Sequence, residues 1–150
     1  MAHAEQTSHS SKSRKMFLLF SHTLTDGQKK DARESLGVAE FIALPEALQR
    51  YWSQIPPESD LDESDLGRLL DWLSAEADRG DYVLVQGDFG ATFYVVDFCL
   101  LNGLRPVYAT TRRTVTQETS AENKVISVKH FEHVRYRHFR YFQEHKRDSK

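Results

Sequence analysis

Tyr82-Val83-Leu84-Val85-Gln86-Gly87-Asp88-Phe89-Gly90-Ala91-Thr92 is the stretch of sequence that decides the fold. Its first four residues are apolar and predict a buried strand, because strands covered on both faces read as continuous hydrophobic runs. The glycines that follow permit either a positive φ or a close approach of the backbone to another group. The apolar segment 91–101 predicts a helix directly after this turn. A strand that turns through glycines into a helix is typical of an α/β protein.

The sequence before this stretch also alternates between strand and helix. Residues 16–20 are apolar and end in Ser21-His22-Thr23, which predicts a strand that feeds a polar loop. Thr25 offers an N-cap for a helix over residues 28–36, and Gly37 stands where a C-terminal glycine stop belongs. The remaining pattern up to residue 80 predicts a strand over 38–44 and helices over 46–54 and 66–79.

The sequence after the stretch changes from helix to strand. Asn102-Gly103 predicts the end of the helix, and residues 106–109 predict a fourth strand that opens into the loop Thr110-Thr111-Arg112-Arg113. The β-rich segments that follow are 114–118, 124–129 and 133–141, and they predict a hairpin or a three-stranded extension. We therefore expect a Rossmann-like α/β fold, with a mainly parallel sheet flanked by helices and a C-terminal antiparallel extension.

Length and composition favour one soluble domain. The chain has 150 residues, 39% of them hydrophobic and 28% charged, and no apolar run approaches the roughly 20 residues of a membrane span. We expect the domain to cover residues 16–142, between a disordered tail over 1–15 and a flexible tail over 143–150. Cys99, the only cysteine, is expected in the core, which fits a reducing, cytoplasmic location.

Three predicted loops point to a binding site for an anionic ligand. Ligands of open α/β sheets lie outside the carboxyl ends of the parallel strands. The loops at that edge are residues 21–25, 86–92 and 110–113. Free N–H groups at the start of the helix after Gly87 can hold a phosphate, and the guanidinium groups of Arg112 and Arg113 can neutralise it. The alternative interpretations are a tight turn whose Asp88 only caps the helix, and a solvated strand end at Thr110.

The sequence predicts neither a cofactor nor a metal centre. The turn after residue 85 lacks the G-x-G-x-x-G fingerprint of dinucleotide binding and the lysine of a P-loop. The acids of residues 58–65 can bind a divalent ion, but carboxylates at a helix start also complement its dipole. In residues 130–141 bases alternate with aromatic residues, which suits either a grip on nucleic acid or a half-buried edge strand. On a strand, His130 and His133 face opposite sides, so no zinc site is expected there.

Several segments of the chain together resemble a known family. They are Phe17-Leu18-Leu19-Phe20-Ser21-His22-x-Leu24-Thr25, Ser35-Leu36-Gly37-Val38, Trp52-Ser53-x-Ile55-Pro56-Pro57, Gln86-Gly87-Asp88-Phe89-Gly90-Ala91-Thr92 and Thr110-Thr111-Arg112. They resemble the Csx family's member twenty, a small CRISPR-associated accessory protein of type III systems, over about residues 16–142. The resemblance implies a stand-alone relative of the CRISPR-associated Rossmann-fold (CARF) domains that sense cyclic oligoadenylates.

The resemblance also implies an activity, because the family is linked to ring nucleases. We expect the chain to bind cyclic tetra-adenylate and to cleave it without a metal, which switches off an antiviral signal. Attack by the ribose 2′-hydroxyl leaves a 2′,3′-cyclic phosphate, so the protein mainly aligns the reacting groups and stabilises charge. Ser21 and His22 are expected to orient or deprotonate this hydroxyl, and Arg112 is expected to neutralise the phosphate.

The expected binding site consists of the glycine-containing turn and the loop after the fourth strand. Its residues are Gln86, Gly87, Asp88, Phe89, Gly90, Ala91, Thr92, Thr110, Thr111 and Arg113. A cyclic tetranucleotide has approximate two-fold symmetry, which an isologous homodimer matches, so we expect a dimer and neither DNA nor a membrane as partner. Two alternatives remain open: a module that sequesters the messenger without cutting it, and a single-stranded RNA binder that uses residues 133–142.

Overall fold

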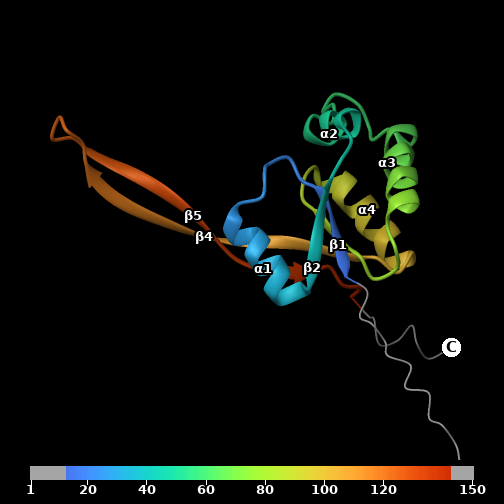
Figure 1. Ribbon diagram of the computed structural model, residues 1–150. Coiled ribbons are helices and arrows are strands. Elements are labelled where there is room, and N and C mark those ends of the chain that lie inside the picture. Colours follow the sequence, from blue (N-terminus) through green and yellow to red (C-terminus); the bar gives the residue numbers. More distant parts are fainter. Residues whose placement is uncertain (1–12, 143–150) are drawn as a thin grey trace, which may run out of the picture.

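The computed structural model describes residues 13–142, which form a mixed α/β fold (Figure 1). In chain order the elements are β1 (Arg14–Leu19), α1 (Asp26–Leu36), β2 (Val38–Ala43), α2 (Glu46–Ser53), α3 (Glu63–Glu76), β3 (Tyr82–Val85), α4 (Phe89–Leu101), β4 (Arg105–Thr119) and β5 (Val125–His138). None of these helices, all within residues 13–142, has the length and hydrophobicity that crossing a bilayer requires. The order of strands and helices is the one that the sequence predicts.

The strands of the described residues form one sheet in the order β2-β1-β3-β4-β5. β1 pairs in parallel with both β2 and β3, and β3 pairs in parallel with β4. β5 pairs antiparallel to β4 and forms an edge of the sheet. The predicted parallel core with a C-terminal antiparallel extension is therefore confirmed, and the extension is a hairpin.

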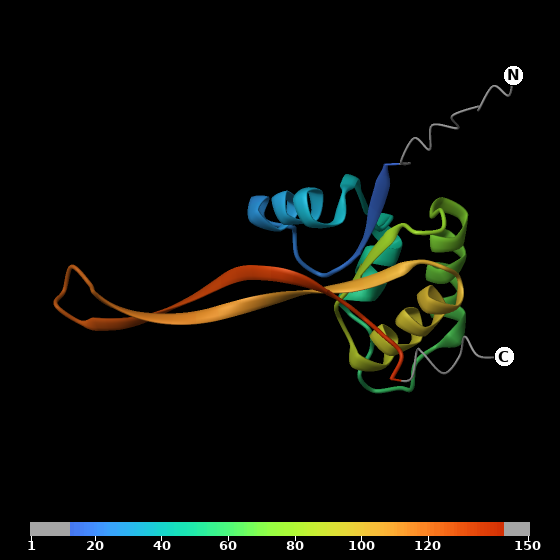
Figure 2. The same cartoon turned by 90° about the horizontal axis from the view of Figure 1, so that it is seen from below.

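Helices cover both faces of the sheet (Figures 1 and 2). α2, α3 and α4 pack on one face, where the core contains, among others, Phe17, Leu19, Trp52, Leu69 and Val83. α1 packs on the other face, where the core contains Met16, Ala32, Leu84 and Val107. Cys99 is fully buried in the first of these cores, as predicted, and burial raises the pKa of its thiol to about 12.

The ends of α1 are set by groups that satisfy its terminal backbone atoms. The Thr25 hydroxyl accepts a hydrogen bond from the Gln28 amide (3.2 Å), and the Gln28 side chain accepts one from the Thr25 amide (2.9 Å). This reciprocal capping box satisfies two donors that the helix itself leaves free. Gly37 ends the helix in the left-handed conformation with φ 70°, which glycine adopts without strain. The N-cap at Thr25 and the stop at Gly37 are confirmed.

β1 begins at Arg14, earlier than the apolar run predicts. The Asp81 carboxylate accepts the Lys15 amide at 3.1 Å, and the Lys15 ammonium lies 3.9 Å from the same carboxylate. Lys15 is thus held in the sheet by polar contacts, which leave no hydrophobic signal in the sequence. The other residues of the predicted tails, 1–12 and 143–150, lie outside the described residues.

β4 and β5 continue far beyond the body of the protein as a two-stranded arm, residues 111–119 and 125–133 (Figures 1 and 2). The prediction that Thr110-Thr111-Arg112-Arg113 forms a loop is wrong, because these residues lie within β4. Both faces of the arm are exposed, so the apolar alternation that marks a half-buried strand is missing. The arm contains threonines instead, and threonine favours strands.

The base of the arm is tied to α1. His133 Nε2 lies 2.7 Å from an Asp31 carboxylate oxygen, and the Tyr136 hydroxyl donates to the Gln28 carbonyl oxygen at 3.1 Å. The register between β4 and β5 shifts close to this anchor, and such bulges bend and re-aim a strand. The direction of the arm is therefore fixed by contacts with the opposite end of the sequence.

Asp31 makes this anchor sensitive to acid. Burial alone would raise the pKa of Asp31, but hydrogen bonds from Ser35 and His133 and the charges of His133 and Arg135 outweigh it, so that the pKa lies below its usual 3.8. Ionised Asp31 therefore stabilises the fold at pH values above its usual pKa. This stabilisation is lost as the pH falls through the lowered pKa. At neutral pH we expect Asp31→Asn to unfold at a lower urea concentration than the wild type. At strongly acidic pH we expect the two proteins to unfold at the same urea concentration. A difference of the same size at both pH values would contradict this.

Candidate functional site

The carboxyl ends of the parallel strands form the edge from which the arm leaves the sheet (Figure 1). β1 and β3 are neighbours there, although the chain passes from β1 to α1 on one face and from β3 to α4 on the other. Ligands of open α/β sheets bind at such switch points. The Gln86 amide donates to the Leu19 carbonyl oxygen at 3.0 Å, so the loops after β1 and β3 start side by side.

Gln86 connects three elements at this edge. Its carbonyl oxygen accepts the indole N–H of Trp52 from α2 at 3.1 Å. Its side-chain oxygen accepts the amide of Ala109 from β4 at 2.9 Å. Gln86 is thus engaged in the scaffold through both oxygens, and it positions the neighbouring Tyr108.

Gly87 and Gly90 allow close packing of side chains. A Cβ atom at Gly87 would lie 2.9 Å from the Trp52 ring, and one at Gly90 would lie 3.0 Å from a methyl carbon of Leu61. Neither glycine has a positive φ. The group that approaches the backbone at Gly87 is therefore an indole ring of the protein itself.

The amino end of α4 combines a cap with free donors. The Asp88 carboxylate accepts the Ala91 amide at 2.9 Å, which confirms the predicted cap. The amides of Phe89 and Gly90 donate to no acceptor within residues 13–142. Because a helix also carries partial positive charge at this end, these amides can bind an anion.

Asp88→Ala tests whether this carboxylate has more than a capping role. Loss of the cap should lower the free energy of unfolding by about 1 kcal/mol and should not weaken the binding of an anionic ligand. Asp97→Ala, which removes an exposed carboxylate from the same helix, is the matched control and should change neither quantity. Urea unfolding and a binding titration check both. A large loss of affinity at unchanged stability would place Asp88 against the ligand.

An aromatic cavity of about 340 Å³ opens beside the amino end of α4. Its lining residues are Val85, Gln86, Gly87, Phe89, Thr92, Tyr108 and Phe139. The rings of Tyr108 and Phe139 pack at 4.9 Å between centroids, and Phe89 is 95% exposed at the rim. Exposed aromatic rings of this kind can stack on nucleobases.

Thr92 lines the aromatic cavity, but its hydroxyl does not face it. Its Oγ1 is buried and has no hydrogen-bond partner within residues 13–142. Buried polar groups are nearly always paired in folded proteins, so this oxygen is an exception within the described residues.

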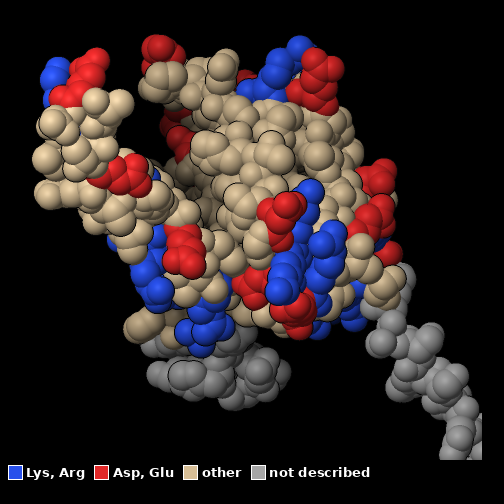
Figure 3. Space-filling view, turned by 60° about the vertical axis from the view of Figure 1, so that its left-hand side comes forward, with Lys and Arg blue, Asp and Glu red and all other residues tan. Residues whose placement is uncertain are grey.

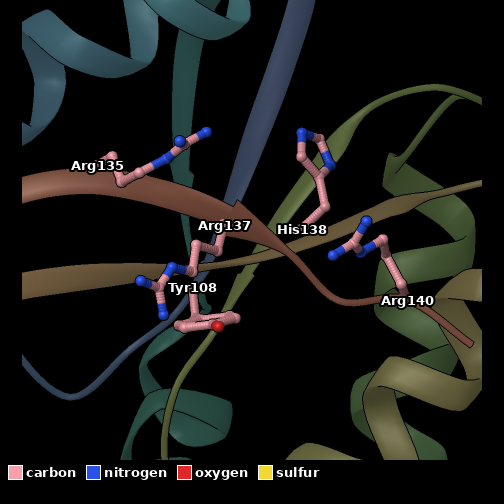
Figure 4. Close-up of a pocket in the computed structure, with 5 residues that line it drawn as sticks. All are labelled: Tyr108, Arg135, Arg137, His138 and Arg140. Carbon is pink, nitrogen blue, oxygen red and sulfur yellow. The ribbon is translucent and has the colours of Figure 1, made fainter. Parts of the chain in front are cut away.

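A basic cavity of about 430 Å³ adjoins the aromatic one (Figure 4). Its lining residues are Tyr108, Arg135, Arg137, His138 and Arg140. Tyr108 and Arg137 lie on one side of β5, and Arg135 and His138 lie on the other, so the cavity extends around the edge strand (Figure 4). Tyr108 belongs to both cavities and forms the wall between them.

The positive charge of the basic cavity is largely uncompensated. Arg137 and Arg140 form no ion pair in the part of the chain that the structure describes. Arg135 donates to the Tyr136 carbonyl oxygen at 3.2 Å and lies near enough to Asp31 to help lower the pKa of that carboxyl group. Guanidinium groups bind phosphate through paired N–H donors, so this cavity suits a phosphodiester.

Ser21 and His22 lie in a third cavity, of about 480 Å³, here called the α1 cavity. It also contains Lys29 and is lined by apolar residues of the α1 face, whereas the aromatic cavity lies on the α4 face. Ser21 and His22, two of the three predicted catalytic residues, are exposed, and the His22 ring packs edge-on against Phe20 at 5.3 Å. The structure thus places them at the same edge as the predicted turn but in a different cavity from the arginines.

Residues 110–113, for which the sequence predicts a loop, lie at the base of the arm or within it. The Thr110 hydroxyl donates to the Arg135 carbonyl oxygen at 3.1 Å, which fastens β4 to β5. Thr111, Arg112 and Arg113 line none of the three cavities described above. Because strand residues alternate, Arg112 and Arg113 also point to opposite faces. The structure does not bring Arg112 or Arg113 into the same cavity as His22.

The acidic residues at the start of α3 cap that helix or lie in its first turn. Asp62 accepts the Ser64 amide at 2.8 Å as the N-cap, and Glu63 and Asp65 lie in the first turn. Among residues 13–142 there is no group of three or more His, Cys, Asp or Glu side chains placed to hold a metal ion. His130 contacts Thr116, and His133 contacts Asp31 on the opposite face of the ribbon.

Sequence reasoning missed the residues that form the basic cavity. Tyr108, Arg137, His138 and Arg140 were outside the predicted site, although the alternation of bases and aromatic residues in 130–141 is the signal that points to them. The interpretation of this segment as an edge strand is confirmed, since β5 is the edge of the sheet. The alternation of bases and aromatic residues therefore indicates both an edge strand and a charged surface.

The family described as "Uncharacterized protein MJ1673 family" matches residues 14–137. The chain belongs to this family. A protein of Methanocaldococcus jannaschii, "Uncharacterized protein MJ1673", is 46% identical over 125 residues, which cover 83% of this chain and 96% of that protein. No solved structure matches. The family match begins with β1 and includes the whole arm, and since these descriptions name no activity, the resemblance to the Csx family's member twenty stays a prediction.

Proposed function

We propose that the protein binds cyclic tetra-adenylate in the aromatic and basic cavities and cleaves it as a metal-independent ring nuclease. The observation that carries this proposal is the shared wall at Tyr108, which joins a cavity suited to a base to one suited to a phosphate. A nucleotide needs both kinds of surface next to each other.

The sheet supports the proposal at the level of the fold. The parallel strands run in the order β2-β1-β3-β4, as in doubly wound Rossmann-like sheets, and the cavities lie at the carboxyl ends of the strands. We therefore propose a CARF-like domain. Fold alone does not determine a ligand, and the choice of a cyclic oligoadenylate comes from the resemblance of the sequence segments.

The proposed reaction needs no external reactant. The ribose 2′-oxygen attacks the adjacent phosphorus and loses its proton to a base, while the bond from phosphorus to the 5′-oxygen breaks. The leaving 5′-oxygen takes up a proton, and the product is linear with a 2′,3′-cyclic phosphate. Arg137 and Arg140 would stabilise the charge that builds on the phosphate oxygens, and His138 lines the same cavity as a candidate base.

A second candidate function is binding without cleavage. The observation that favours it is the separation of Ser21 and His22 from the basic cavity. A general base must lie within hydrogen-bond reach of the proton that it removes. If neither His22 nor His138 reaches a 2′-hydroxyl, the protein sequesters the messenger intact.

The test is incubation with labelled cyclic tetra-adenylate in the presence of EDTA, followed by separation of the products. We expect linear products that end in 2′,3′-cyclic phosphate, with or without EDTA. Complete dependence on a divalent ion would overturn the metal-independent mechanism. A ring that is bound but never cut would support sequestration. Equal affinity for unrelated linear RNA, falling steeply with salt, would support a single-stranded RNA binder instead.

A further inference from the structure

The arm is a long surface that the other residues of the described range 13–142 leave uncovered. Beyond its anchor on α1, residues 111–119 and 125–133 extend away from the body in both views of the fold (Figures 1 and 2). Strands of this length reach about 30 Å, comparable to the width of a small domain. An isolated two-stranded hairpin is only marginally stable in water. Such an arm gains stability when a second surface packs against it.

One face of the arm carries exposed apolar residues interspersed with bases. The register between the strands places Arg113, Val115, Val125, Lys129 and Phe131 on this face, which we call the arm face, together with the uncharged polar residues Gln117, Thr119 and Ser127. Phe131 is 68% exposed, Val115 is 57% exposed and Val125 is 68% exposed. In a space-filling view the arm stands apart from the body, and much of its surface carries neither acid nor base (Figure 3). Its occupant must therefore offer apolar groups and negative charge.

The amino end of α4 has this complementary character. Phe89 and Phe93 lie one turn apart on α4, 95% and 78% exposed. Asp88 is the N-cap of α4, and Asp62 and Asp65 at the start of α3 follow Leu61, which packs against Gly90 in the first turn of α4. We call Phe89, Phe93 and these three acids the α4 patch. It pairs exposed aromatic rings with acids, where the arm face pairs apolar residues with bases.

The arm cannot cover the α4 patch of its own chain. Both project from the carboxyl edge of the sheet, but the arm runs away from α4 (Figures 1 and 2). We propose that two copies of the chain exchange arms, so that the arm face of each packs on the α4 patch of the other. A two-fold axis generates both contacts at once, because an isologous interface uses the same pair of surfaces twice.

The area of such an exchange is sufficient for a stable dimer. Phe131, Phe89 and Phe93 enter the interface twice, and aromatic side chains bury about 150–250 Å² each. With the valines of the arm face, the total reaches the range of about 1,200–2,000 Å² that stable interfaces bury. The charges of Arg113 and Lys129 meet the acids of the α4 patch at its rim.

Arm exchange also adds a positive charge to the anion site at the amino end of α4, which is separate from the basic cavity. The acids near the amino end of α4 oppose the approach of an anion, although the amides of Phe89 and Gly90 face it. Arg113 from the second copy brings a positive charge to this turn, whereas no base among residues 13–142 lines the aromatic cavity beside it. This part rests on the proposed function, whereas the exchange of arms does not.

The first experiment measures the oligomeric state without any ligand. In sedimentation velocity we expect the full chain to be a dimer, and Phe131→Glu or Phe93→Asp to weaken dimerisation by about 30-fold or more. Thr114→Glu, on the opposite face of the arm, and Leu101→Asp, at the far end of α4, are the matched controls and should leave the dimer intact. A monomeric wild type, or equal effects of all four changes, would overturn the proposal.

The second experiment shows which surfaces meet. A photoreactive benzoylphenylalanine at position 131, mixed with isotope-labelled wild-type chains, should cross-link to labelled peptides that contain Phe93. Cross-links only within one chain, or to another part of the labelled copy, would overturn arm exchange.

The third experiment concerns Arg113. Arg113→Ala should weaken binding of cyclic tetra-adenylate by about tenfold, whereas Lys124→Ala at the tip of the arm should not. A dimer that binds no cyclic tetra-adenylate would refute the proposed function and leave arm exchange standing. A monomer that binds it would do the reverse.

Discussion

Replacing Arg137 and Arg140 together by alanine should weaken the binding of cyclic tetra-adenylate by about 10²- to 10⁴-fold. Both guanidinium groups line the basic cavity and lack ion-pair partners among the described residues, so their donors are available to phosphate. A hydrogen bond to a charged group contributes about 1.5–3 kcal/mol, and each 1.4 kcal/mol is a factor of ten. The variant should also show a flatter dependence of affinity on salt, because fewer counterions are released. Fluorescence titrations at several salt concentrations measure both effects.

Matched variants separate the geometry of the basic cavity from its charge. Arg137→Lys keeps the charge but loses the planar fork, so its affinity should fall between those of the wild type and Arg137→Ala. Arg50→Ala removes an exposed guanidinium that pairs with Glu46 on α2 and should leave binding unchanged. If the double alanine variant binds the ring as tightly as the wild type, the basic cavity is not the phosphate site.

The predictable part of the fold depends on signals within a few residues of one another. Thr25 and Gln28 cap α1 through their own side chains, and Gly37 ends it through its own backbone. The apolar run before Gln86 likewise marks a strand that is buried on both faces. Such elements need no tertiary context, so the sequence alone predicts them.

The arm could not be predicted because its sequence lacks the pattern of a half-buried strand. The sequence of residues 110–113 predicts a polar loop. These residues form a strand because they pair with β5. The anchor between Asp31 and His133 joins residues from opposite ends of the chain, and no local pattern connects them. Long-range pairing of this kind is invisible to a scan along the sequence.

The sequence predicts the edge of the sheet at which the cavities lie, but it does not predict which side chains line them. Parallel strands bring the loops after β1 and β3 to one edge, which follows from topology. Whether a residue there binds ligand or supports the scaffold depends on its partners. Gln86 contacts Trp52 and Ala109, and Gly87 contacts Trp52, so both act in the scaffold.

The aromatic cavity and the α1 cavity lie on opposite faces of the sheet, which is consistent with a ligand larger than one nucleotide. The aromatic and basic cavities meet at Tyr108, while the α1 cavity with Ser21 and His22 lies beyond the shared edge of β1 and β3. A ring of four nucleotides is wide enough to place different phosphates near different walls. The position of the catalytic base therefore depends on which phosphate is cleaved.

His138→Ala should slow single-turnover cleavage by about 10²- to 10⁴-fold and leave affinity for the ring nearly unchanged. His138 lines the basic cavity with Arg137 and Arg140 but lies on the other side of β5 from Arg137, so it acts as the base if the bound ring extends around this edge strand. Rapid-quench measurements with enzyme in excess isolate this step from product release. His22→Ala is the comparison, because His22 lies in the α1 cavity and was the base that the sequence predicted. If His22→Ala slows cleavage and His138→Ala does not, the cleaved phosphate lies over the α1 cavity, and the basic cavity serves only to hold the ring.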